Sequence, residues 1–221
     1  IERGLDEPRV IELGTAALLH DVGMVKVARL IQAPTTLSPE ARAQVQEHPA
    51  WSGQLLKTCR ELPAVVRQAI TQEHERVDGS GYPNRLKGAA IHEYAQLVGL
   101  LDVYESLTHD RPHRPRLMPS EAMRTMIQGS GSAFRTELLR AFLRATPMFP
   151  VESWVQLNTG DLAKVIATTR RMPLTPTGTI LVNPRGRPRA RPETIDLAKE
   201  QRFRIAKAVP EPHLKEVSSD Q

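Results

Sequence analysis

The sequence has one cysteine, Cys59, and no apolar run long enough to cross a membrane. A single thiol excludes disulfides within the chain and is typical of a reducing compartment, and we interpret Cys59 as a structural thiol and not a nucleophile. The apolar stretch at residues 97–101 is far shorter than the ~20 residues that a spanning helix needs. The opening IERGLDEP lacks the basic and then apolar pattern of a signal peptide. We therefore predict a cytoplasmic protein with no membrane segment in this chain.

An initiator methionine is also missing, so we expect residues to precede Ile1 in the full protein. Residues 183–192, NPRGRPRARP, hold neither an acid nor an aromatic ring that could stack on a base. The net charge of +5 is compatible with an anionic partner, but part of that excess lies in this stretch. Its interleaved proline and glycine predict an exposed hairpin loop. We favour this loop over a nucleic-acid contact and predict no nucleic-acid partner.

Apolar residues make up 40% of the chain, which is enough to bury a core, and their spacing predicts helices from residue 9 to about 146. Ser38 predicts the cap of one helix, and Pro49 predicts that this helix ends at His48. The other helices are expected to end near His20, to cover 50–59, to follow Pro63, to be buried within 91–107, and to cover 119–128 and 134–145.

From residue 149 the pattern changes to short apolar runs separated by turn residues such as Asn158-Thr159-Gly160, which is typical of β-hairpins. We predict a mainly α fold with a helical domain at residues 1–148 and a small β-rich extension at 149–207. Residues 208–221 are polar and predicted to be a disordered tail.

Several ionisable residues lie at the ends or inside the apolar faces of the predicted helices: His20, Asp21, His48, Glu73, His74 and Asp102. The histidines and the last aspartate are separated by 28, 26 and 28 residues, so antiparallel helices could bring them to one end of the core. Asp102 lies within an apolar helix, where an unpaired carboxylate would cost several kcal/mol. Such a mixed set suits Fe, Mn or Zn, and its size favours two metals that share Asp21.

Each of these histidines could alternatively be a hydrogen-bonded side chain at a helix end. The remaining histidines lack partners that would support ligation, and we interpret them as surface residues: His92, His109, His113 and His213.

Four segments resemble the HD-GYP family in order and spacing: HDVGM at 20–24, TLSPEARAQVQEHPAWSGQLL at 36–56, EHERVDGSGYPNRLKGAAI at 73–91 and LLDVYESLTHDRPHR at 100–114. The resemblance covers residues 9 to about 146, and residues 150–205 are similar to a β extension that often follows this domain. It implies an HD-type helical bundle.

The resemblance also implies a phosphodiesterase that hydrolyses cyclic di-GMP to pGpG, and in some members on to GMP, with two or three iron or manganese ions. His20 and Asp21 would be catalytic metal ligands, with Asp21 bridging, and His48, His74 and Asp102 would complete the ligand set. Arg111 and Arg114 match the pair that holds substrate phosphate, since guanidinium groups bind phosphate in a bidentate manner.

The motif DGSGYP is expected to form a lip beside the metals. Gly79 and Gly81 allow conformations that other residues resist, in a turn that begins at Asp78. Pro83 would stiffen the loop, and Tyr82 would face substrate at the rim. The resemblance implies roles in substrate access and in docking to GGDEF-domain cyclases; alternatively, the loop only connects two helices.

The chain departs from the family in three ways. Met24 stands where the family has a lysine, and Glu73 replaces the first of two adjacent histidines but can still bind a hard metal. The family's first histidine ligand belongs to a helix before His20, which we expect to lie outside this chain, together with an N-terminal receiver or sensor domain. Two alternatives to a phosphodiesterase therefore stay open: a weak or inactive module that binds signalling partners, and an HD phosphohydrolase of other nucleotides.

Overall fold

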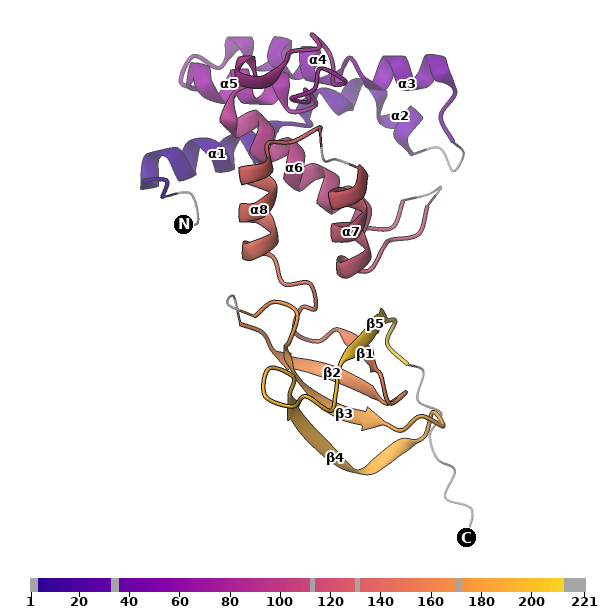
Figure 1. The fold of residues 1–221 in the computed structure, drawn as a ribbon. Helices are drawn as coiled ribbons and strands as arrows, with labels where there is room; N and C mark the ends of the chain where they lie inside the picture. The colour runs from indigo at the N-terminus through magenta and orange to yellow at the C-terminus, as the bar shows by residue number, and fades with distance from the viewer. Residues whose placement is uncertain (1–3, 33–35, 112–113, 130–131, 170–171, 213–221) are drawn as a thin grey trace. The chain divides into compact units, whose positions relative to one another are not determined.

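The computed structural model describes residues 4–32, 36–111, 114–129, 132–169 and 172–212 (Figure 1). By its internal contacts the chain divides into one unit of residues 1–117 with 124–141 and a second unit of 118–123 with 142–221. The helices and 3-10 helices follow in the order α1 (Glu7–Leu19), η1 (Val22–Val27), α2 (Ala28–Ile31), α3 (Pro39–Val45), α4 (His48–Leu55), η2 (Leu56–Thr58), α5 (Ala64–Gln72), η3 (Gly88–Ala90), α6 (Glu93–Thr108), α7 (Pro119–Gly129) and α8 (Thr136–Ala145).

The predicted boundary between the helix that follows Ser38 and the helix at 50–59 was wrong. Ser38 caps α3 as expected, because its Oγ accepts from Ala41 N at 3.2 Å, but α3 ends at Val45. His48 is the first residue of α4, and Pro49 lies in its first turn. Proline is tolerated there because the first N–H groups of a helix have no intrahelical acceptor. Pro49 therefore marks the start of α4 and not the end of α3, and this helix start positions His48.

The core of the first unit lies where α1, α5 and α6 pack together. Its buried members are Ala16, Leu62, Val66, Ala69, Ile70, Ile91, Tyr94, Ala95 and Val98. The helix predicted to be buried, α6, is buried only in its first half, and Leu101 is 47% exposed. The N-terminus of α6 is capped by His92, whose Nδ1 accepts from Tyr94 N at 3.1 Å. Among the described residues no helix is long and apolar enough to span a membrane.

The second unit contains an antiparallel sheet of five strands in the order β4-β3-β2-β1-β5 (Figure 1). Its strands are β1 (Trp154–Leu157), β2 (Leu162–Ala167), β3 (Thr177–Val182), β4 (Pro188–Asp196) and β5 (Ile205–Val209). One face builds a core that includes Val155, Val165, Ile180 and Phe203. The domain boundary that we predicted between residues 148 and 149 falls between α8 and β1, and it stays a prediction.

The arginine-rich stretch is not only a loop, because β4 begins at Pro188 and forms an edge of the sheet. An edge strand tolerates proline, which cannot donate to the ladder. Arg189 also pairs with the buried Asp161 at 2.7 Å and with Glu193 at 3.1 Å, so part of the positive charge is neutralised within the fold. The predicted tail was placed too early, since β5 extends to Val209. Residues 213–221 lie outside the described residues.

Candidate metal centre

The structure brings together the six side chains that the sequence predicts as ligands. His20 directly follows α1, and Asp21 comes next; Glu73 directly follows α5. The Nε2 atom of His48, at the start of α4, lies 3.4 Å from Asp21 Oδ1 and 3.4 Å from Glu73 Oε1. Ligand atoms of four residues lie within 4.8 Å of one another: Asp21, His48, Glu73 and His74. We call these four the metal cluster.

His20 and Asp102 border the metal cluster. The Nε2 atom of His20 lies 3.5 Å from Asp21 Oδ2, 3.8 Å from Glu73 Oε2 and 4.0 Å from Asp102 Oδ1. Asp102 reaches this position from the middle of α6. Side chains from four helices therefore face one small volume, as the spacing along the sequence predicts.

Two of the histidines are oriented by main-chain carbonyl groups. Nδ1 of His20 lies 2.7 Å from Ala17 O, and Nδ1 of His48 lies 2.7 Å from Val45 O. A carbonyl oxygen can only accept, so Nδ1 of each ring is the protonated nitrogen. In the neutral ring the lone pair of Nε2 is directed toward the carboxylates, which is the arrangement that metal-binding histidines use. Without a metal, and against the opposite effect of burial, the neighbouring carboxylates raise the pKa of both rings, which favours the protonated form.

Glu73 provides the test of whether a metal fits. Its side chain is fully buried, and neither carboxylate oxygen has a hydrogen-bond partner among the described residues. An uncompensated buried carboxylate is strongly unfavourable, so this position calls for a positive charge nearby, which either a metal ion or a protonated His20 or His48 supplies. The Nε2 atoms of His48 and His74 also lie only 3.2 Å apart. A divalent metal ion between these nitrogen and oxygen atoms fits the donor set.

The electrostatics of the cluster agree with ligation. Burial, together with the positive charges of His48 and Arg76, lowers the pKa of His74 to about 3, so its ring is neutral at pH 7. Burial raises the pKa of Glu73, and burial and Asp21 raise that of Asp102. The negative charge of Asp21 also raises the pKa of both carboxyl groups, against the opposite effect of His20. Cations would relieve this repulsion.

The structure also identifies a supporting residue that the sequence analysis missed. Ser52, fully buried in α4, accepts from Gly23 N at 2.8 Å and donates to His20 O at 2.9 Å. This hydroxyl ties the His20-Asp21 segment to the helix that begins with His48. A Cβ at Gly23 would lie 2.3 Å from His48 O, so only glycine allows this approach.

Gly99 in α6 permits an equally close approach, since a Cβ there would lie 2.0 Å from Glu73 O. We expect Gly99→Ala to destabilise the protein by about 2–3 kcal/mol, because main chain has to move to accommodate the methyl group. Thermal unfolding should show a Tm lower by roughly 5–10 °C and a smaller increase on addition of Mn²⁺.

Gly14→Ala is the matched control for this prediction. Gly14 is also helical, but nothing lies within 4 Å of the position that a methyl group there would occupy. Alanine should therefore be neutral or stabilise by about 0.5–1 kcal/mol. Equal Tm values for the two variants would show that α6 does not approach Glu73 this closely.

A pocket of about 390 Å³ opens beside the metal cluster. Its lining includes His20, Asp21, Asp102 and Arg111. Arg111 pairs with Glu105 at 2.8 Å across this pocket. One of the two predicted phosphate-binding arginines is therefore placed beside the ligands.

Arg114 is placed differently, and it does not line the described pocket. Its guanidinium group donates to the carbonyl oxygens of Ser106 and Leu107 near the C-terminus of α6. The main chains of Arg111 and Arg114 are joined by two hydrogen bonds of 2.9 and 3.0 Å. In this conformation Arg114 shapes the turn that presents Arg111.

The GYP loop, which we define as residues 78–88, lies against the cluster. The ring of Tyr82 stacks on that of His74, with centroids 4.7 Å apart and planes inclined by 20°. Asp78 accepts from Ser80 N, Ser80 Oγ and Ser132 Oγ, and these bonds lower its pKa to about 2. Pro83 is exposed next to Tyr82.

The two glycines that precede Tyr82 in the GYP loop are needed for different physical reasons. Gly79 has a φ of +84°, a left-handed conformation that favours glycine. A Cβ at Gly81 would instead lie 2.4 Å from His74 O and 2.4 Å from Arg76 N. Gly81 is therefore needed for close approach of the loop to the segment that contains His74.

No lysine replaces the family's lysine in the described pocket. Met24 is half-buried in η1, and its N–H donates to Asp21 O at 2.8 Å. Lys26 is exposed, and its Nζ lies 5.2 Å from the ring centroid of Trp51. Neither residue lines the pocket that contains Arg111. Two further described histidines are separate from the cluster, since His92 caps α6 and His109 is exposed. His113 and His213 lie outside the described residues.

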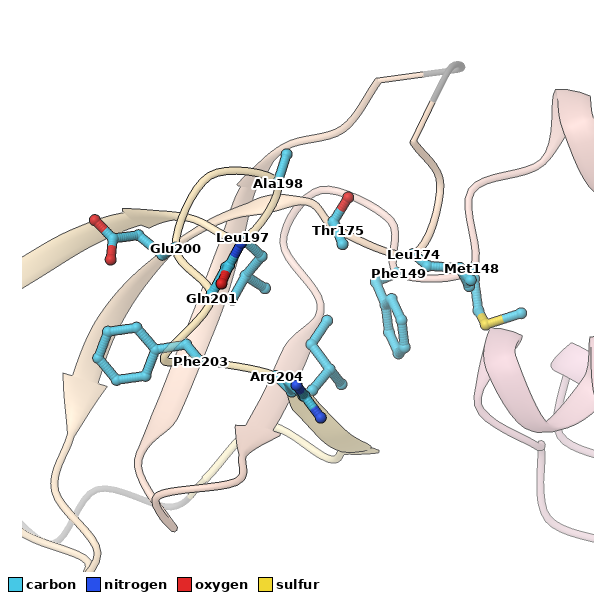
Figure 2. A pocket seen from close by; sticks show the side chains of 11 residues that line it. Met148, Phe149, Leu174, Thr175, Leu197, Ala198, Glu200, Gln201, Phe203 and Arg204 are labelled. Carbon is cyan, nitrogen blue, oxygen red and sulfur yellow. The ribbon is translucent and has the colours of Figure 1, made fainter.

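A separate pocket of about 490 Å³ lies in the second unit. Figure 2 shows its lining, which is mostly apolar and includes Phe149, Leu197 and Phe203. Thr175 Oγ1 is buried there without a hydrogen-bond partner among the described residues. None of the predicted ligands lines this pocket, so it is distinct from the metal centre.

Comparisons with known proteins agree with this geometry. Residues 2–138 match the HD domain family, and residues 154–216 match the KOW domain associated with HD domain. The chain is 33% identical over 196 residues to cyclic di-GMP phosphodiesterase PA4108 of Pseudomonas aeruginosa, covering 88% of this chain and 47% of that protein. It is 29% identical over 143 residues to 3'3'-cGAMP-specific phosphodiesterase 3 of Vibrio cholerae, covering 64% and 31%.

The solved structure of Bd1817, an HDG"Y"P protein from Bdellovibrio bacteriovorus, has a similar fold, with a TM-score of 0.52 at 22% identity. The match covers 62% of this chain and 44% of that one. The chain thus belongs to the HD domain family. Within it the chain is an HD-GYP protein, and the predicted family and fold class are confirmed. The chain spans about half the length, or less, of the curated relatives described above.

Proposed function

We propose that this chain is a metal-dependent phosphodiesterase that hydrolyses cyclic di-GMP to pGpG, with GMP as the product of any further step. The main support is the metal cluster with its buried Glu73, whose carboxylate has no hydrogen-bond partner among the described residues. The relatives add a substrate class, since one is named for cyclic di-GMP and another for 3'3'-cGAMP. Both are cyclic dinucleotides with two phosphodiester groups.

The proposed ligands are the metal cluster with His20 and Asp102. The number and mixture of donors favour two or three divalent ions, and the carboxylates favour iron or manganese over softer metals. Asp21 is the proposed bridge, because its two oxygens face different histidines, Oδ1 toward His48 and Oδ2 toward His20. When bound, the metals would withdraw charge from a phosphodiester and make water a stronger acid.

Arg111 is the proposed phosphate-binding residue. Its guanidinium group lies in the wall of the pocket that contains His20 and Asp21, and it pairs there with the exposed Glu105. A substrate phosphate would compete with Glu105 for the same donors and could bind both terminal nitrogens. We assign Arg114 to support of this turn, and Tyr82 to the rim at which a guanine base would stack.

The test of this function is direct. The protein is loaded with Mn²⁺ or Fe²⁺ and incubated with cyclic di-GMP, and pGpG and GMP are quantified. A parallel incubation with 3'3'-cGAMP and other nucleotides separates the proposal from an HD phosphohydrolase of another substrate. Turnover of cyclic di-GMP no higher than that of Asp21→Ala would reject the proposal.

The alternative is a weak or inactive module that binds signalling partners, and Met24 favours it. A lysine at this position could supply an ammonium group to phosphate, which a thioether cannot do. For an active enzyme we expect Met24→Lys to change kcat by less than about tenfold, with Met24→Leu as the control. A rise from a wild-type rate near zero would favour the alternative instead.

Docking to GGDEF cyclases, an N-terminal receiver or sensor domain and a cytoplasmic location stay predictions. The GYP loop would be the docking surface, and the exposed Pro83 lies on it. A binding assay with an isolated GGDEF domain and a Pro83→Ala variant would test the first of these.

A further inference from the structure

Glu75 is a buried carboxylate that belongs to neither the metal cluster nor the wall of the pocket. Its side chain is 1% exposed, although it lies only two residues from Glu73. Oε1 accepts from Asn84 N at 2.6 Å, and Oε2 accepts from Leu86 N at 2.9 Å. Both oxygens are thus engaged by main-chain N–H groups of the GYP loop. Such charge-assisted bonds are stronger than neutral ones.

The N–H groups of Asn84 and Leu86 flank a residue with an uncommon backbone conformation. Arg85 lies between them with a φ of +54°, which is uncommon for a residue with a side chain. The loop has other ties at its base, because Gly88 N donates to Val77 O at 3.0 Å. The bonds to Glu75 hold the part of the loop that directly follows Tyr82-Pro83.

The same carboxylate lies beside the segment against which Tyr82 packs. Tyr82 N donates to His74 O at 3.2 Å, and the Tyr82 ring stacks on the His74 ring. Arg76 fixes this segment from the other side, since its Nη1 donates to the carbonyl oxygens of Glu73 and Glu75. Residues 73–76 thus form a fixed base, and Glu75 connects the base to the returning half of the loop.

We propose that Glu75 is a positioning residue that holds residues 84–86 and thereby keeps Tyr82 stacked beside the metal cluster at the rim of the site. This inference rests on the proposed function, because the rim is taken to border the substrate. Glu75 does not bind metal or substrate itself. It determines whether the rim has one conformation when the substrate arrives, which is a contribution to binding more than to the chemical step.

The test uses Glu75→Gln in the Mn²⁺-loaded protein. Glutamine has the same shape, but its amide NH₂ faces one loop N–H in place of an acceptor. Hydrogen exchange followed by mass spectrometry should show exchange at least about tenfold faster in peptides covering residues 82–88, with little change in α1, α4 and α5. Mn²⁺ content should stay at the wild-type value, and the KM for cyclic di-GMP should rise about tenfold while kcat falls less than threefold.

Glu61→Gln is the matched control, because Glu61 is exposed and accepts from no main-chain N–H among the described residues. Glu75→Asp covers the case in which Glu75→Gln does not fold, since it keeps both oxygens on a shorter stem and should show faster exchange confined to the loop. Unchanged exchange at residues 82–88, or equally faster exchange throughout the chain, would overturn the inference. A wild-type protein with no turnover would instead contradict the proposed function, and the exchange result would still decide the role of Glu75.

Discussion

Replacing Asp21 by alanine should lower the hydrolysis of cyclic di-GMP by at least about a thousandfold, because one side chain supplies oxygen atoms to both halves of the metal centre. Its Oδ1 lies 3.4 Å from His48 Nε2 and its Oδ2 lies 3.5 Å from His20 Nε2. Alanine removes both contacts at once, so the proposed bridge is lost. Metal content measured by elemental analysis should fall together with the rate.

The fold should survive this change. The side chain of Asp21 is 49% exposed, so its removal leaves no cavity, and the free energy of unfolding of the metal-free protein should change by less than about 1 kcal/mol. Asp196→Ala is the control, because Asp196 is an aspartate of the sheet unit whose side chain pairs with Lys199 and accepts from Ala198 N. A variant with Asp21→Ala that retains full metal content and a rate within tenfold of wild type would contradict the bridging role.

Removal of the metals should destabilise the protein strongly, because Glu73 then remains as a buried carboxylate with no hydrogen-bond partner among the described residues. Mn²⁺ at about a thousand times its Kd should raise the free energy of unfolding by about 4 kcal/mol and the Tm by roughly ten degrees. In Glu73→Gln the metal-free protein should be about 1–3 kcal/mol more stable than metal-free wild type, since no charge is buried. The stabilisation by Mn²⁺ should fall to a small fraction of its wild-type value.

The free energy of unfolding of the metal-free protein should depend on pH through Glu73. Burial raises the pKa of Glu73 above its ordinary value of 4.5. The metal-free folded state therefore binds this proton more tightly than the unfolded chain, and stability falls as the pH rises from about 4.5 through the raised pKa. Unfolding by urea at a series of pH values should show this loss in wild type and a smaller one in Glu73→Gln. Equal stabilisation of both proteins by Mn²⁺ would show that Glu73 does not face the metals.

The ligand set could be predicted from the sequence because its signal is local. His20-Asp21 follows an apolar helix, and Asp102 lies within another. Charged side chains at such positions need a partner of opposite charge, and this can be seen before any contact is known. The recurrence of His48 and His74 at similar spacing then predicts one shared end of a bundle. The structure places these side chains together, including Glu73 in the position of a histidine.

The supporting residues could not be predicted in the same way, because their roles depend on contacts between distant segments. Ser52 hydrogen-bonds to Gly23 and His20, which are 29 and 32 residues away in the sequence. Glu75 accepts from a main-chain N–H of the GYP loop nine residues later. Gly99 offered a weak signal, since an isolated glycine inside a helical pattern often has a packing reason. The errors at Pro49 and at Pro188 have one cause: proline was interpreted as a terminator, whereas it is also accepted in the first turn of a helix and on an edge strand.

The most direct test of the central claim is anomalous diffraction from crystals of the Mn²⁺-loaded protein. We expect at least two anomalous peaks, each within about 2.0–2.5 Å of nitrogen or oxygen atoms of the ligand set, with Asp21 shared between them and Glu73 bound to at least one. Peaks only elsewhere on the protein, or none while Glu73 gains a protein hydrogen-bond partner, would contradict the metal centre and with it the proposed phosphodiesterase.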